Sequence, residues 1–255
     1  MKNFWIPFVH AAARPGNGVV DGPVRGDPSV HALLAQWYRE QTGEELPVPV
    51  YPVVDGQWLT YCADEYAAAE HRPQDAQVRQ AYQVLVGELL QQFLLFVDAG
   101  YVIQLWPGMG EPYANSEAMR ADVRQHRRLW VYPTGDTMPV DHPLAAPSPV
   151  AGFCWNEVFR AVHDLAGHAW NGYSFSVRGE EAACRAQLLL HSPSAHPALV
   201  CETRMQSAWI VFGPHRRGGS TTPLVFPPQK AFCPPANCLH NDRWLKEQSS
   251  CQKNV

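Results

Sequence analysis

The run PQDAQVRQAYQVLVGELLQQFLLFVDA, from Pro73 to Ala99, is the longest regular pattern in this chain of 255 residues. Its apolar side chains recur at steps of three and four residues, which places them on one broad face of a helix. Gly100 is well placed to end that helix. The apolar positions are Val78, Ala81, Tyr82, Leu85, Val86, Leu89, Leu90, Phe93, Leu94 and Val97. The run therefore favours a mainly α protein.

Further helices are expected on both sides of this run. Asp27 is a suitable N-cap, Pro28 a suitable first residue and Gly43 a suitable end for the earliest helix. Ser116 is a suitable N-cap for a helix to about His126. Three more apolar helical patterns lie at about 154–169, 179–191 and 195–212.

Strands are expected to be few and short. They are predicted at Pro47 to Val54, Tyr101 to Trp106 and Leu129 to Tyr132. Proline-rich or glycine-rich loops are predicted at 133–151 and 213–242, an irregular or lightly stranded segment at 1–26, and a loose helix from Arg243. We therefore predict one mainly α domain over residues 1–255, with long Pro/Gly-rich loops and a small marginal β-sheet.

Composition narrows the class of protein. Hydrophobic residues make up 46% of the chain and charged residues 17%, which suits a sizeable core. The net charge is -4 and the basic runs at 126–128 and 215–217 are short, so we predict no nucleic-acid partner. The N-terminus lacks the pattern of a secretory signal, and no apolar run approaches the roughly 20 residues of a membrane span. We therefore predict a cytoplasmic protein that acts on a small molecule.

The cysteines give no disulfide pattern, because seven is an odd number and they are scattered. Cys154, Cys184 and Cys201 fall within apolar helical patterns, where a free cysteine behaves as a small hydrophobic residue. Cys233 and Cys238, with His240 nearby, are a possible metal clip, although a second cysteine pair is missing.

Titratable and polar residues gather between positions 156 and 209, on three helices that are otherwise apolar. Acids and histidines are costly to bury there unless they are paired, protonated or bound to metal, and metal ligation accounts for several at once. The set is Asn156, Glu157, Arg160, His163, Asp164, His168, Glu180, Glu181, Arg185, His191, Glu202, Arg204 and Gln206.

The segment His163-Asp164-Leu165-Ala166-Gly167-His168 is the best candidate for the core of a metal site. On a straight helix each residue turns by roughly 100°, so the two histidines project roughly 140° apart. Asp164 and His168 are four residues apart and nearly in line. Gly167 can loosen or end the helix and so allow His163 and His168 to converge. The spacing permits either pairing.

Glu202 is the predicted third ligand, because it shares a helix face with Gln206 and Trp209 and has apolar neighbours. Two histidines and one carboxylate form the ligand set of non-haem Fe(II) oxygenases, which leaves positions open for O2 and substrate. The alternatives are ordinary ion pairs. Those alternatives are Asp164 with Arg160, Glu181 with Arg185, and Glu202 with Arg204, or in place of the last a bond from Glu202 to a buried backbone group.

The HDLAGH segment resembles the HELLGH segment of the aromatic amino acid hydroxylases, which bind one iron through both histidines and a later glutamate. The resemblance covers about residues 155–209 and implies that His163, His168 and Glu202 bind Fe(II). It differs in having Asp164 after the first histidine. The pterin-binding segment of that family is not found upstream, so the resemblance leaves open whether a pterin is a cofactor. The set HD-x2-GH, GEE and ETR-x-Q-x2-W also resembles uncharacterised bacterial and phage proteins.

In the oxygenase hypothesis, the polar residues around the iron have separate roles. Asp164 would orient a ligand, while Arg204 and Gln206 would position substrate or oxygen. Glu180 or Glu181 would neutralise a basic substrate, or Glu181 would bridge to a second iron. Oligomeric state is left open.

Two other functions remain as alternatives. Val162-His163-Asp164-Leu165 resembles the HD-domain phosphohydrolases, although their upstream histidine would have to be His142 or His126. A helical binding module whose polar groups are buried salt bridges is the third hypothesis.

Overall fold

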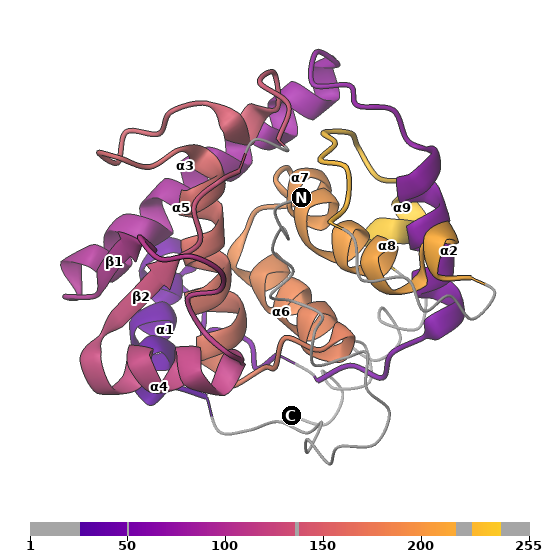
Figure 1. Ribbon diagram of the computed structural model, residues 1–255. Helices are drawn as coiled ribbons and strands as arrows, with labels where there is room; N and C mark the ends of the chain where they lie inside the picture. Colours follow the sequence, from indigo (N-terminus) through magenta and orange to yellow (C-terminus); the bar gives the residue numbers. More distant parts are fainter. Residues whose placement is uncertain (1–25, 50, 136–137, 218–225, 241–255) are drawn as a thin grey trace.

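The computed structural model describes residues 26–49, 51–135, 138–217 and 226–240, and within them the protein is mainly α-helical (Figure 1). The predicted fold class is therefore confirmed. The α-helices are α1 (Pro28–Thr42), α2 (Gly56–Ala68), α3 (Ala76–Asp98), α4 (Ser116–His126), α5 (Trp155–Val162), α6 (Val177–Leu190), α7 (His196–Val200), α8 (Gln206–Phe212) and α9 (Ala236–Leu239). Two segments, η2 (His163–Ala169) and η3 (Cys201–Met205), are π-helical, while η1 (Pro143–Ala145) and η4 (Pro214–Arg216) are short 3-10 turns.

Helix caps explain most of the boundaries. Asp27 accepts hydrogen bonds from the backbone N–H groups of Ser29 and Val30, and Gly43 ends α1 in the left-handed conformation (φ 77°). The predicted first helix is therefore confirmed. The long helix begins at Ala76 rather than Pro73, because Asp75 is its N-cap.

The prediction around residue 50 is wrong for the described residues, because 47–49 and 51–54 form no strand. Asp55 instead accepts hydrogen bonds from the N–H groups of Gln57 and Trp58 and so begins α2, a helix that we did not predict. This helix begins with Gly56, and glycine is a poor helix former, so the sequence carries a weak signal for its start. Its apolar face packs against α8.

The sheet is small, as predicted. Strands β1 (Val102–Leu105) and β2 (Arg128–Val131) pair in parallel, with Val102 opposite Arg128. The two strands are parallel because α4 crosses between them, and α4 packs on β2. The sheet lies at one side of the molecule, beside α1 and α4 (Figure 1). The predicted loop at 133–151 contains only η1 and an isolated bridge between Pro147 and Cys154 in its described part.

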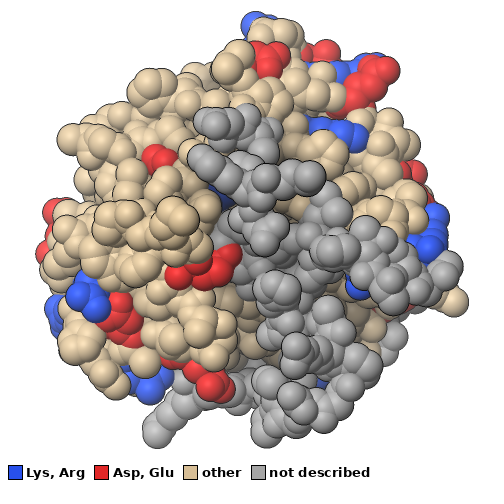
Figure 2. Space-filling view, viewed as in Figure 1, with Lys and Arg blue, Asp and Glu red and all other residues tan. Residues whose placement is uncertain are grey.

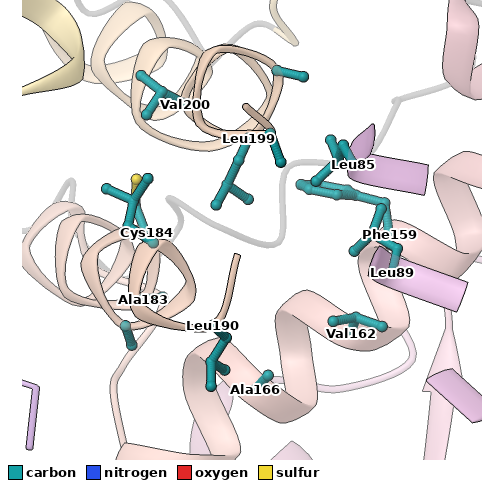
Figure 3. Close-up of a cluster of buried hydrophobic side chains, with 14 of the residues drawn as sticks. Leu85, Leu89, Phe159, Val162, Ala166, Ala183, Cys184, Leu190, Leu199 and Val200 are labelled. Atoms are coloured by element: carbon teal, nitrogen blue, oxygen red, sulfur yellow. The ribbon is translucent and has the colours of Figure 1, made fainter. Parts of the chain in front are cut away.

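The core lies where α3, α5, α6 and α7 meet. Figure 3 shows side chains from all four helices, and from the adjoining η2, converging on one apolar volume. The fully buried side chains there are Leu85, Leu89, Val162, Ala166, Ala183, Cys184, Leu199 and Val200. This packing fixes η2 against α6, which is the contact that builds the candidate site.

On the face shown in Figure 2, the acidic and basic side chains of the described residues are scattered together and form no large patch of one charge. No helix among the described residues is long and apolar enough to cross a membrane. The expectations for residues 1–25 and for the tail from Arg243 lie outside the described residues.

Candidate metal centre

His163 and His168 lie on a widened helical turn that continues α5. In η2 the backbone hydrogen bonds span five residues instead of four, as in the bond from the N–H of Trp170 to the carbonyl of Leu165. Side chains five residues apart therefore lie above one another, and the two Nε2 atoms are 3.1 Å apart. The histidines converge because the helix widens, and Gly167 does not end it.

Gly167 allows η2 to lie very close to α6. A Cβ atom added at this glycine would be 3.1 Å from the Cβ of Ala183 and 3.5 Å from Nδ1 of His163. The first distance is shorter than ordinary van der Waals contact, so any larger residue would push the two segments apart. The glycine thus contributes close packing as well as local freedom.

Glu180 completes the group from the first turn of α6. Its Oε2 is 3.3 Å from Nε2 of His163, and its Oε1 is 3.4 Å from Nε2 of His168. All three residues are buried. Among the described residues, they form the group of potential metal ligands in which one atom from each lies within 4.8 Å of the others.

Hydrogen bonds orient both imidazole rings with Nε2 toward this group. Nδ1 of His168 is 3.2 Å from the backbone carbonyl of Tyr173, which can only accept, so Nδ1 carries the proton. Nδ1 of His163 is 2.6 Å from Oε1 of Gln187 and donates in the same way. In the neutral rings both Nε2 atoms then present lone pairs, and they face a carboxylate.

Three electron-pair donors that converge in a buried site need a positive charge between them. A proton is one candidate. Burial lowers the pKa of His163, but the hydrogen bond and charge of Glu180 outweigh it and leave that pKa raised. Burial raises the pKa of Glu180, but the two histidines outweigh it and leave that pKa lowered. The site therefore favours a carboxylate with a cation beside it.

A metal ion is the other candidate, and the spacing suits it. Two ligand atoms about 2.1 Å from one ion and about 90° to 110° apart are separated by about 3.0 to 3.4 Å. The distances among His163, His168 and Glu180 are 3.1, 3.3 and 3.4 Å. Oε1 of Glu180 is also buried without a hydrogen-bond partner. The residues present thus fit a divalent metal.

A small cavity lies beside the group. Its volume is about 60 Å³, and His163 and Glu180 line it together with Glu202. Phe159 also lines it and stacks on His163, with ring centroids 5.9 Å apart. Phe175 meets the ring of His168 edge-on at 4.9 Å. The aromatic rings give the ligands a dry, low-dielectric surrounding, where electrostatic interactions are strong.

Glu202, the predicted third ligand, lies outside the group of three. Its carboxylate accepts hydrogen bonds from Oη of Tyr82 and from Nε2 of Gln206, the latter at 2.8 Å. Glu202 belongs to η3, the second π-helical segment, and reaches the cavity wall instead of the histidines. Among the described residues, Glu180 is the carboxylate that groups with both imidazoles.

Arg204 and Glu181 are bound to each other and neither lines the cavity, so neither is placed for the substrate role expected from the sequence. Nε and Nη2 of Arg204 donate to Oε2 and Oε1 of Glu181 at 2.7 and 2.9 Å. Arg185 donates to the same carboxylate at 2.7 Å, which is the alternative pairing expected from the sequence, although it is buried. Glu181 therefore ties α6 to η3 and is not placed to bridge a second iron.

Asp164 and Gln206 lie near the site in different ways. Asp164 is outside the group of three, and burial raises its pKa to about 6 against the opposing charges of the two histidines. Gln206 lines the cavity and exchanges long hydrogen bonds of 3.4 Å with Gln229. Cys233, Cys238 and His240 form no such ligand group among the described residues.

The contacts of Glu180 and Gln187 with the histidines were not predicted from the sequence. These residues are seven apart on an apolar helix and therefore share one face, whereas Glu181 and Arg185 share another. That seven-residue spacing was a signal for an inward glutamate supported by an inward amide. Tyr82, His142 and Gln229 come from distant parts of the chain and carried no such signal.

Comparison of the chain with protein-family models, curated proteins and solved structures found no match. The resemblance to the aromatic amino acid hydroxylases accordingly remains a prediction from the HDLAGH segment.

Proposed function

We propose that this protein is a mononuclear non-haem iron enzyme that uses O2 to oxidise a small molecule. The observation that supports it is the convergence of His163, His168 and Glu180, with both imidazole Nε2 lone pairs directed at the carboxylate. Two histidines and one carboxylate, with further positions open, are the ligand set of Fe(II) oxygenases. Bound iron would supply the sites at which O2 and substrate meet.

The other residues would prepare the ligands and exclude water. Gln187 and the carbonyl of Tyr173 accept the Nδ1 protons, which fixes the orientation of each ring and makes each Nε2 a better donor. Phe159 and Phe175 cover the ring faces and edges. The small cavity beside His163 and Glu180 is large enough for O2 and for one small group of a substrate.

The phosphohydrolase alternative receives less support. An HD-type site needs the aspartate beside the first histidine to bind the same ion, yet Asp164 is outside the ligand group among the described residues. Arg160, one turn earlier in the helix, is among the charged groups that act on it, after His163 and His168. His142, one of the two candidate upstream histidines, lies beside Glu202 and stacks on His71.

Metal content and a matched pair of variants test the proposal. The purified protein is stripped of metal, reloaded anaerobically with Fe(II), and titrated as wild type, Glu180→Gln and Glu202→Gln. We expect Glu180→Gln to lose at least about tenfold in iron affinity, because it removes a ligand. Glu202→Gln should bind iron nearly as wild type. The reverse order would show that Glu202 is the ligand and Glu180 is not.

Nitric oxide tests the open position, because it binds Fe(II) where O2 would bind. The iron-loaded wild type should give the electron paramagnetic resonance signal of a high-spin iron–nitrosyl complex. A protein that retains only zinc, or whose iron gives no nitrosyl signal, would contradict an O2-dependent function.

A further inference from the structure

Glu202 is a buried carboxylate on the wall of the cavity beside the candidate metal centre. Its side chain is 2% exposed, and it lines the same cavity as His163 and Glu180. A carboxylate in such a place is costly unless its charge is balanced. The neighbours of Glu202 therefore show whether the described residues supply a balancing positive charge.

The hydrogen-bond donors to Glu202 are neutral. Burial, reinforced by Cys201 and Glu202, raises the pKa of Tyr82 well above its ordinary value, so its hydroxyl keeps the proton that it donates. The amide of Gln206 donates from the other side. These bonds hold the carboxylate in place, but they supply no positive charge.

His142 is also neutral in this arrangement. Its Nδ1 accepts a hydrogen bond from the backbone N–H of Leu144, so the ring proton is on Nε2. That Nε2 lies 3.3 Å from Oε1 of Glu202 but outside hydrogen-bond geometry. The imidazole is a polar neighbour of the carboxylate, not its counter-ion.

No lysine or arginine among the described residues forms an ion pair with Glu202. Arg160 lines the same cavity, but its Nη1 donates to the carbonyl of Tyr132, and the charges of Asp164 and Glu157 act on its guanidinium. Arg204, two residues along the chain, is paired with Glu181. The Glu202 carboxylate thus lines the cavity without an ion pair to a lysine or arginine of the described residues.

We propose that Glu202 binds a protonated nitrogen of the substrate, an amine, amidine or guanidine, in the cavity beside the metal. This inference rests on the proposed function for its account of what happens to the substrate. The cavity of about 60 Å³ suits such a group, since one water needs on the order of 10 to 15 Å³. The rings of Phe159 and Phe226 also line it and favour a cation near their faces.

The wall around Glu202 offers hydrogen-bond acceptors to such a cation. Nε2 of Gln206 and Nε2 of Gln229 each donate to the other's amide oxygen at 3.4 Å, and bonds of that length are weak enough for an incoming N–H group to replace. Asn156, whose Nδ2 donates to Thr134, lines the cavity as well. A substrate that carries several N–H donors can therefore be satisfied.

A second metal ion fits Glu202 less well than a cationic nitrogen does. Tyr82 and Gln206 direct hydrogens toward the carboxylate, and the Nε2 of His142 also carries one. A metal needs lone pairs from its surroundings. Among the described residues, Glu202 belongs to no group of three candidate ligands within 4.8 Å.

Acetamidine and acetamide are suitable probes, because they have the same shape and differ in charge. Their binding is measured by calorimetry on wild type, on Glu202→Gln and on Glu40→Gln, which makes the same charge change at an exposed position. Each protein is tested metal-free and loaded with Fe(II). We expect wild type and Glu40→Gln to bind acetamidine at least tenfold more tightly than acetamide. Glu202→Gln should lose that preference.

The result that would overturn the inference is equal binding of the two probes to wild type, a comparison that needs no variant. Retention of the preference in Glu202→Gln would overturn it too, as would a second equivalent of metal that disappears in Glu202→Gln. The two proposals fail separately. Acetamidine binding without any iron binding would remove the proposed function and keep this inference, while iron binding without a charge preference would do the opposite.

Discussion

Gly167 shows how one hydrogen atom in place of a side chain sets the geometry of the histidines. The Cβ atom that alanine would bring lies 3.1 Å from Ala183 and 3.5 Å from His163. Relief of that contact must move η2 away from α6, and α6 carries both Glu180 and Gln187. The distances that define the candidate site therefore depend on a residue that has no functional group.

We predict that Gly167→Ala lowers iron affinity by about 10-fold to 100-fold, the usual effect of disturbing the support of a metal ligand. Overpacking should also lower the free energy of unfolding by about 1 to 3 kcal/mol. Iron titration and denaturant unfolding measure the two effects. The double variant Gly167→Ala/Ala183→Gly removes the Cβ of residue 183, which the new methyl group at residue 167 would contact, so its iron affinity should recover. Failure to recover would show that the glycine is needed for its backbone conformation instead.

At the scale of the element, the π-helical segments account for what sequence patterns could not supply. Caps and apolar spacing predicted the helices α1, α3 and α4 because those signals are local, but the N-cap of α4 is Asn115, whose side chain accepts from the N–H of Ala118, and not Ser116 as predicted. The extra residue in the turns of η2 and η3 has no comparable signature, and α-helical geometry turns His163 and His168 apart. The wider turns of η2 bring the two histidines together, and the packing of η2 on α6 places them beside Glu180.

The choice of carboxylate was also beyond the local pattern. Three glutamates, Glu180, Glu181 and Glu202, lie on apolar helices, and their partners come from other elements. Glu181 forms an ion pair with Arg204, and Glu202 accepts a hydrogen bond from Tyr82 of the distant α3. Only Glu180 shares its own helix face with a residue, Gln187, that supports the site. The sequence thus predicted the histidines and the presence of a carboxylate, but not which one.

Gly179 controls the start of α6 and hence the position of the next residue, Glu180. A Cβ at Gly179 would lie 1.8 Å from the backbone oxygen of Ser174, an atom that cannot turn away. We predict that Gly179→Ala lowers the free energy of unfolding by about 1 to 3 kcal/mol and weakens iron binding. Thermal unfolding and iron titration are the measurements.

The control is the same change in a helix with free space. Gly87 lies within α3, and a Cβ there meets nothing within 4 Å. Gly87→Ala should raise stability by about 0.5 to 1 kcal/mol and leave iron affinity unchanged. If both variants behaved alike, the close approach of Ser174 would have no part in placing Glu180.

At the scale of the whole molecule, residues 226–240 are joined to the helical core by two cations. Nζ of Lys230 donates to the carbonyls of Tyr66, Ala67 and Ala69 at the end of α2, at 2.7 to 3.1 Å. Nη1 of Arg204 donates to the carbonyls of Cys238 and Leu239. These contacts place a segment from the end of the described chain against the cavity and so complete the wall that faces the metal ligands.

The pH dependence of folding is also a property of the whole molecule, and Glu111 makes a definite contribution to it. Burial raises the pKa of Glu111 to about 8, although the charge of Arg160 opposes the shift. Its Oε2 is buried without a hydrogen-bond partner. The folded protein therefore keeps a proton at neutral pH that the unfolded chain releases, since an exposed glutamate titrates at about 4.3.

Because the folded state binds more protons between about pH 4.3 and 8, this group makes stability fall as pH rises through that interval. Glutamine resembles the protonated side chain and does not titrate. We predict that Glu111→Gln unfolds like wild type near pH 4 and at a progressively higher temperature than wild type up to pH 8, with no further gain above it. Glu44→Gln makes the same change at an exposed position and is the control. A difference between Glu111→Gln and wild type that does not grow with pH would mean that the carboxyl is already ionised in the folded protein.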